Sequence, residues 1–491
     1  MAVLLVPGAV FAWRALDGGG PQPHDVLPAD SIGYVRIDMD PSAAQKVEAF
    51  RFLRKFPGFK EATGITDEDD DLRELFIDEF SDATGCDLDF AEDVEPWLGH
   101  RVGAAALPPS DDSGAPGFAL ALQADDEDAA RETFEKAQDC GGDEASIGLS
   151  YADGYLIITD TQENADAYVE SAQESSLADN EDFAETMDLL GDPGVVSFWV
   201  SGTGMLDVFG EALENTEPLP GDESLPGMEE SRELLEGSYQ SFAATFRFDD
   251  SYAEIAAVTT GDIYKDMGTG GVQADVPDDT SLLMGMAGGG DALLDNWDEI
   301  LESYPDATEQ IDALEAQTGF TLPDDLATLL GDSLLVALDG NGLDVPAVFM
   351  GDFSSLNAGV KVATDAGAFS EIWAQIQDMA AQAGESLDGV PVHETDDGYI
   401  VASNDEYAAT LGEGGALADA DVYTTAVRDA ADADAVFFVN FDSFEDAVLD
   451  TLGEQGIGED TLESIRTLQA LGVSARSHDG YAEMTMRLTA D

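Results

Sequence analysis

Two segments of the chain show the same order of apolar and polar positions. Residues 177–213 and 417–452 both begin with Leu-Ala-Asp, and each then predicts a helix, a buried strand and a second helix. The apolar positions of the first helix match in pairs: Phe183 with Tyr423, Met187 with Val427, and Leu190 with Ala430. This match indicates that part of the chain arose by internal duplication.

Further matches extend the duplication over most of the chain. Residues 28–31 match 277–280, 97–102 match 329–334, 153–157 match 397–401, and 252–255 match 481–484. A separation of about 240 residues is too long for a solenoid repeat and fits two domain-sized copies. We therefore predict a first copy over residues 27–261, a linker over 262–274 and a second copy over 275–491.

Within each copy the apolar pattern predicts hairpins and helices together. Residues 31–40 alternate as a half-buried strand, with Val35 and Ile37 on its apolar side. Asp153-Gly154 predicts a hairpin turn, and the apolar run 195–200 predicts a strand buried on both faces. Because the elements do not alternate strictly as βαβ units, we predict an α+β fold. It consists of two tandem copies of an antiparallel sheet of hairpins, each covered by helices.

The first 26 residues have a different composition. The apolar run in residues 1–16 stops at Arg14, so as a helix it covers about 20 Å of a membrane core of about 30 Å. It also lacks a preceding basic flank. We interpret it as a partial membrane anchor or signal segment in a chain that starts late, the alternative being a disordered apolar N-terminus. Residues 17–26 predict a flexible Gly/Pro linker.

The net charge disfavours two classes of partner. The chain has 104 Asp and Glu residues against 19 Lys and Arg, a formal net charge of −85 at pH 7. Nucleic acid and anionic lipid headgroups would both be repelled. The acidic residues are spread along the chain. The hydrophobic fraction of 44% is normal for a globular chain, and the strong apolar periodicity argues against disorder. This distribution favours adaptation of the whole surface to salt over an acidic binding arm.

One short motif suggests an enzyme. Residues 331–334 read Gly-Asp-Ser-Leu, which is typical of one class of esterases and lipases. That chemistry needs Ser333 to be activated by a histidine, normally from a late Asp-x-x-His. None of the four histidines, His24, His100, His393 and His478, has an aspartate three residues before it. A hydrolase that uses Ser333 is therefore our alternative function, and a turn before a strand is the simpler explanation.

The densest acidic run, residues 67–71, raises the question of calcium. An EF-hand loop would need glycine at position 72 and glutamate at position 78, which are Leu72 and Asp78. We favour a solvated helix N-terminus, and keep a calcium-dependent surface protein as a further alternative. Weak, diffuse binding of Ca²⁺ is expected from the charge alone. No catalytic, cofactor-binding or metal-binding residue is assigned.

Two other features stay open at this stage. Cys86 and Cys140 could form a disulfide in an exported protein, but sequence does not tell whether they approach one another. The aromatic residues of the two predicted buried strands fit core packing, or a lipid-lined cavity between sheet and helices: Phe198, Trp199, Phe437 and Phe438.

The opening of the first copy resembles a known family. The stretch from Leu27 to Ser42, then Gln45-Lys46 and residues 52–57, resembles domain-of-unknown-function family 3352, found in actinobacterial and related exported proteins. The resemblance implies one N-terminal membrane helix before a large extracytoplasmic part. It brings no catalytic residues.

These observations lead to one main hypothesis. We expect an uncharacterised cell-membrane protein, single-pass, with an extracytoplasmic C-terminal part and a non-enzymatic binding or structural role. Its expected partners are the membrane, through the N-terminal segment, and an unknown protein or apolar ligand. No cofactor is expected.

Overall fold

The computed structural model describes residues 20–491 with several internal gaps. The gaps are 40–42, 60–70, 72, 75–87, 110–115, 142–146, 203, 205–238, 266–269, 304–306, 341–355, 385, 388 and 455–456. The predicted anchor (1–16), most of the acidic run 67–71 and Cys86 lie outside the described residues, and so does the side chain of Cys140. No helix in the described part is both long and apolar enough to cross a membrane.

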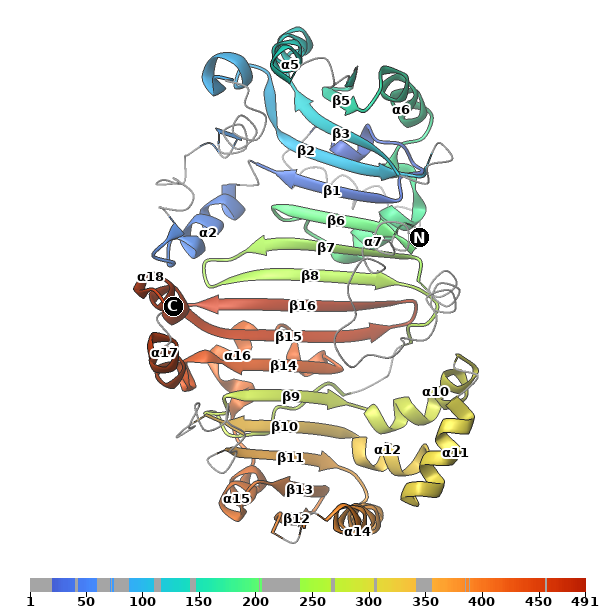
Figure 1. The fold of residues 1–491 in the computed structure, drawn as a ribbon, viewed down its shortest axis with the longest axis vertical. Coiled ribbons are helices and arrows are strands. Elements are labelled where there is room, and N and C mark those ends of the chain that lie inside the picture. The colour runs from blue at the N-terminus through green and yellow to red at the C-terminus, as the bar shows by residue number, and fades with distance from the viewer. Residues whose placement is uncertain are drawn as a thin grey trace, which may run out of the picture. The chain divides into compact units, whose positions relative to one another are not determined.

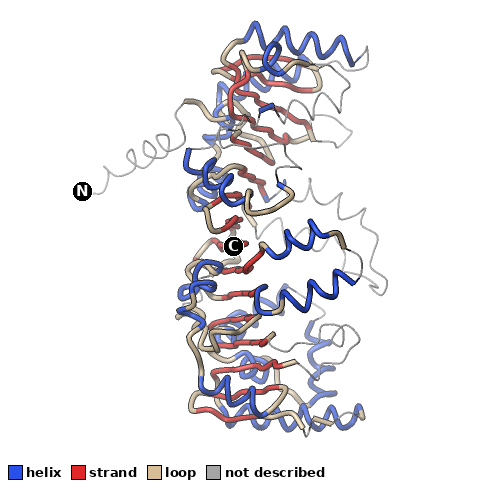
Figure 2. The backbone as a smooth tube through the Cα atoms, turned by 90° about the vertical axis from the view of Figure 1, so that its left-hand side faces the viewer, coloured by secondary structure: helices blue, strands red, loops and turns tan. Residues whose placement is uncertain are grey.

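The chain divides into two compact units. The first comprises Met1–Arg54, Phe59–Asp250 and Ile255–Ile263, and the second comprises Lys55–Gly58, Ser251–Glu254 and Tyr264–Asp491. Each unit is a mixed α and β structure, which confirms the predicted fold class. Figure 1 shows the strands and their covering helices, and Figure 2 shows helices on both sides of the strands of the second unit.

The strands of the first unit follow the order β8-β7-β6-β1-β2-β3-β5-β4. They are β1 (Gly33–Asp38), β2 (Leu98–Leu107), β3 (Gly117–Ala124), β4 (Gly148–Ala152), β5 (Tyr155–Thr159), β6 (Val196–Ser201), β7 (Ser241–Phe248) and β8 (Tyr252–Thr260), of which residues 252–254 belong to the second unit. The helices are η1 (Pro23–Asp25), α2 (Ala43–Leu53), η2 (Phe90–Val94), α5 (Glu127–Gly141), α6 (Gln162–Glu174), η3 (Leu177–Asp179) and α7 (Glu181–Leu190). The predicted hairpin turn is confirmed, since Asp153 and Gly154 join β4 to β5 with positive φ angles of 46° and 85°.

The second unit has the order β16-β15-β14-β9-β10-β11-β13-β12, which is the first order with each label raised by eight. Its strands are β9 (Leu282–Ala287), β10 (Ser333–Asp339), β11 (Asn357–Ala363), β12 (Val392–Thr395), β13 (Gly398–Ala402), β14 (Ala435–Asn440), β15 (Leu468–His478) and β16 (Tyr481–Ala490). Its helices are α10 (Gly289–Ser303), α11 (Ala307–Thr318), α12 (Asp324–Leu330), α14 (Ala366–Ala383), α15 (Asp405–Glu413), η4 (Leu417–Asp419), α16 (Asp421–Ala426), η5 (Ala430–Asp432), η6 (Phe441–Ser443), α17 (Glu445–Glu454) and α18 (Glu459–Arg466). A duplication would produce this shared order, and the duplication itself stays an inference.

The two Leu-Ala-Asp segments occupy comparable places in the two cores. Leu177 and Leu417 are fully buried, and each begins a short 3-10 helix. Behind them, an aromatic ring of the following helix packs edge-on against a buried ring of the sheet. The pairs are Phe183 with Trp199 at 5.4 Å and Tyr423 with Phe438 at 5.1 Å between ring centroids. Trp199 and Phe438 are therefore core residues, as one of the two sequence interpretations held.

Two expectations need correction. The stretch after the N-terminal segment is packed from Gln22 to Leu27, where Pro23 and His24 form η1 and are buried, so the flexible linker does not extend to residue 26. The strand at residues 195–200 is not buried on both faces. In β6 Ser197 and Trp199 are buried on one side, while on the other side Val200 is buried but Val196 and Phe198 are only half-buried.

Candidate functional site

Ser333 lies at the beginning of β10, half-buried, between Ala287 and Ala363 of the neighbouring strands. Among the described residues, no histidine forms a hydrogen bond with it. His393 contacts Asp405 at 3.2 Å and His478 contacts Glu483 at 3.1 Å. The preceding Gly331 ends α12 with a φ of 60°, a conformation that favours glycine. The Gly-Asp-Ser-Leu sequence thus has a structural explanation, and the contacts give the hydrolase interpretation no support.

The described part of the acidic run does not form a cation site. The carboxylate of Asp71 accepts hydrogen bonds from Arg73, with 2.6 Å between Asp71 Oδ2 and Arg73 Nη2, and this partner lowers the pKa of Asp71. Within the described residues, no three Asp, Glu, His or Cys side chains are arranged to hold a metal ion.

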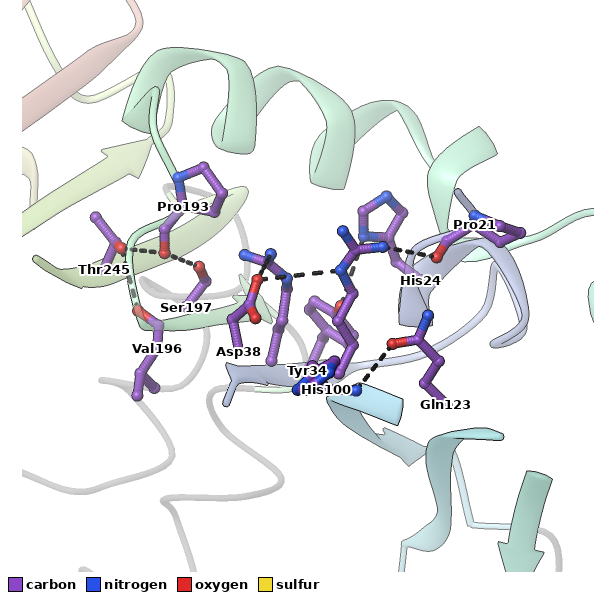
Figure 3. Close-up of polar contacts among 12 residues, drawn as sticks. Pro21, His24, Tyr34, Asp38, His100, Gln123, Pro193, Val196, Ser197 and Thr245 are labelled. Carbon is purple, nitrogen blue, oxygen red and sulfur yellow. Dashed lines mark hydrogen bonds and ion pairs between the residues drawn. The ribbon is translucent and has the colours of Figure 1, made fainter. Parts of the chain in front are cut away.

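The first unit contains a buried group of charged side chains, which we call the first-unit arginine cluster: Arg36, Asp38 and Arg101. Arg36 Nη2 lies 2.8 Å from Asp38 Oδ2, and Arg101 Nε lies 4.0 Å from the same oxygen. All three residues are less than 10% exposed. Figure 3 shows Asp38 and its dashed contacts. This burial contradicts the predicted orientation of β1, since its polar side faces the core and Ile37 is 38% exposed.

The cluster fixes the segment that leads into the first unit. Arg101 Nη1 donates a hydrogen bond to the Pro21 carbonyl at 3.4 Å, and the Tyr155 hydroxyl donates to the same oxygen at 2.9 Å. Burial is the main cause that raises the pKa of Tyr155, so this hydroxyl stays a donor. Figure 3 shows Pro21 and the polar residues around it. The opposed charges at Arg36 and Asp38 were the available sequence signal, but only the fold brings Arg101 to them.

The second unit does not need such a cluster at the same place. Pairing registers place Gly285, Ala287 and Ser333 where the first unit has Arg36, Asp38 and Arg101. The chain leading into this unit packs through apolar contacts instead, with Val272 and Ala274 almost fully buried. The end of the predicted linker 262–274 is therefore also packed.

A second charged network belongs to the second unit. Arg487 Nε lies 2.8 Å from Glu254 Oε2, and Arg428 Nη1 lies 3.9 Å from Glu254 Oε1. The Arg487 guanidinium also lies 4.1 Å from the centre of the Tyr252 ring and donates to the Thr425 carbonyl at 3.2 Å. Glu254 is nearly buried. Through Arg487, this network connects β16 with α16 and with the beginning of β8.

One face of the sheet of the second unit carries apolar side chains that are only partly covered in the described structure. A cross-strand row, here called the apolar row, runs over six neighbouring strands from β11 to β16. It consists of Val360, Val336, Met284, Phe437, Val473 and Met486. None of the six is fully buried, and Met284 is 50% exposed although its strand is paired on both sides. The opposite face carries the buried core residues Leu283, Val436 and Phe438.

Comparison with known proteins finds a family match for the first third of the chain. Residues 1–167 match the family model described as "Protein of unknown function (DUF3352)". The family resemblance is confirmed for this part of the chain. No curated protein matches the chain.

Two solved structures are distantly similar. They are titled "Structure of crystal form I of TP0453" and "Structure of crystal form III of TP0453", with 10% and 8% sequence identity. Each match covers 49% of this chain, and 78% and 80% of the other chain, with TM-scores of 0.21 and 0.22. Similarity this low supports no conclusion about function.

Proposed function

We propose that this protein is a membrane-tethered, extracytoplasmic protein that binds an apolar ligand and acts by binding rather than by catalysis. The apolar row of the second unit carries the proposal. A half-exposed methionine on an interior strand is unusual, because apolar side chains there are normally covered by another layer.

The chemistry of this face favours an acyl chain as the ligand. Apolar surface gains about 25 cal/mol for each Å² removed from water, and methionine adapts its shape to irregular apolar partners. Because β9 is paired with β10 and β14, a protein partner cannot add a strand beside Met284. The charge of −85 disfavours an anionic headgroup.

The tether is supported by composition and family. The apolar segment at residues 1–16 precedes the packed part of the chain, and the family resemblance, which implies an N-terminal membrane helix, covers this segment. Location outside the cytoplasm follows from the same resemblance and is part of the proposal.

Native mass spectrometry of the full chain, purified from its own host, tests the binding role. We expect species heavier than the polypeptide by the mass of a lipid with an acyl chain. Replacement of Met284 by glutamate should lower the affinity for a fluorescent acyl-chain probe at least tenfold, because a carboxylate would have to be desolvated on the apolar row.

A matched variant separates this effect from a general effect of added charge. Leu314 on α11 is 45% exposed and does not belong to the apolar row, so Leu314→Glu should leave probe affinity unchanged. A bare polypeptide mass, together with equal probe binding by both variants, would contradict the proposal.

A further inference from the structure

The second unit holds a cavity of about 110 Å³ on the face of the sheet where α16 packs. It lies between the segment after α16 and the strands β15 and β16. Seven of its lining residues carry charged or hydroxyl groups: Arg428, Asp429, Asp432, Ser474, Arg476, Glu483 and Thr485. Its lining therefore offers both charges and two hydroxyls within a small volume.

Two opposite charges stand on this face without neutralising each other. Arg476 of β15 is directly opposite Glu483 of β16 in the pairing register. Within the described residues, however, their charged atoms do not form an ion pair, and Glu483 instead contacts His478 Nε2 at 3.1 Å. Cross-strand partners of opposite charge normally meet. Here the cavity lies beside them.

The second guanidinium at the cavity is held in place. Arg428 Nε lies 3.2 Å from Asp429 Oδ2, and its Nη1 lies 3.9 Å from Glu254 Oε1. Asp429 has a positive φ of 46°, an uncommon backbone conformation for a residue with a side chain. The end of the Arg428 side chain thus lies beside the cavity and contacts two carboxylates, one in the following connection and one in β8.

The first unit shows that the fold alone does not require the cavity. Its Thr245 and Arg247 stand at the register positions of Ser474 and Arg476. There the short connection before β6 fills the space. Thr245 Oγ1 donates to the Pro193 carbonyl at 2.5 Å, and Arg247 Nη1 donates to the Asp192 carbonyl at 3.4 Å. Figure 3 shows Thr245 and Ser197 directed at Pro193.

In the second unit the corresponding connection, residues 427–434, is longer and contains η5. The cavity is therefore a product of this connection. In the first unit, Thr245 and Arg247 donate hydrogen bonds to the connection before β6. In the second unit, Ser474 and Arg476 stand at the same register positions and line the cavity.

We propose that this cavity binds a small zwitterion, a molecule with an anionic group and an ammonium group close together. The anionic group would contact Arg476 and Arg428, and the ammonium group would contact Glu483 and Asp432. An anion alone would face the carboxylates and the charge of −85, and a cation alone would face two guanidinium groups. The site does not depend on the apolar row, which lies on the opposite face of the sheet.

Isothermal titration calorimetry of the full chain tests the site with four probes at equal ionic strength. Alanine represents a free amino acid, phosphoethanolamine represents a lipid headgroup, and acetate and methylamine represent the separate halves. We expect one of the two zwitterions to bind with a Kd of about 1 mM or lower, and each half to bind at least about tenfold more weakly. The preferred zwitterion identifies the source of the ligand.

Two variants locate the site. Arg476→Gln should weaken binding at least about tenfold, whereas Arg247→Gln, at the matching position of the first unit, should leave it unchanged. If Arg476→Gln lowers the melting temperature strongly, Glu483→Gln replaces it as the test variant, because Glu483 is exposed. Glu483→Gln should also weaken binding at least about tenfold. Absence of binding by both zwitterions, equal binding of acetate, or an equal loss in Arg247→Gln would each overturn the proposal.

Discussion

At the scale of single residues, the basic side chains have unusual importance, because they are few among many acids. Glu254 is nearly buried, and Arg487 is its nearest guanidinium in the second unit. Replacement of Arg487 by alanine removes this charge and the contact with Tyr252. We expect a loss of about 3 kcal/mol in the free energy of unfolding, because a buried carboxylate loses its closest opposite charge. Urea denaturation followed by circular dichroism measures it.

The control is an ion pair at the surface. Arg131 lies 3.0 Å from Glu127 one helical turn away, and both side chains are more than one third exposed. Arg131→Ala should cost about 0.5 kcal/mol or less. Equal losses in the two variants would show that burial does not set the strength of the Glu254 pair.

At the scale of elements, η1 can pack closely on β2 because Gly103 has no side chain. A Cβ at Gly103 would lie 2.2 Å from the Cβ of Pro23, well inside contact distance. We expect Gly103→Ala to displace η1 from β2, at a cost of about 1–3 kcal/mol. Hydrogen exchange should then become faster in residues 20–27, where protection now depends on this packing.

Gly58 provides the matched comparison for this variant. An added Cβ there meets no atom within 4 Å, so Gly58→Ala should leave exchange in residues 20–27 unchanged. Unchanged exchange in Gly103→Ala would instead mean that the hydrogen bonds to Pro21 are sufficient to hold the segment.

At the scale of the whole molecule, repulsion among acidic groups opposes compactness. The Debye length falls from about 10 Å at 0.1 M salt to about 3 Å at 1 M, so added salt screens this repulsion. For a net charge of −85 we expect the melting temperature to rise steadily over this range, measured by differential scanning calorimetry in potassium chloride.

The same measurement separates screening from specific cation binding. Micromolar Ca²⁺ at constant ionic strength should leave the melting temperature unchanged if screening is the cause. A rise under these conditions would favour the alternative of a calcium-dependent surface protein.

The pattern of apolar positions was sufficient for the fold class, the hairpin at Asp153-Gly154 and the core positions of Trp199 and Phe438. These features depend on local periodicity and turn chemistry, which neighbouring residues specify. The predicted orientation of β1 was wrong, and the reason is physical. Alternation defines two sides of a strand but does not tell which side is covered. Here Arg36 and Asp38 are buried together with Arg101, which comes from another strand and also donates to the Pro21 carbonyl.

By itself, the sequence determined the net charge, the repeated order of elements and the family resemblance, because each is a property of residues along the chain. Only the tertiary structure decided where the sheet stays uncovered at Met284 and where a cavity opens beside Arg476. Both depend on how long connections pack over a sheet. Contacts between residues far apart in the chain set that packing, and no local pattern encodes them.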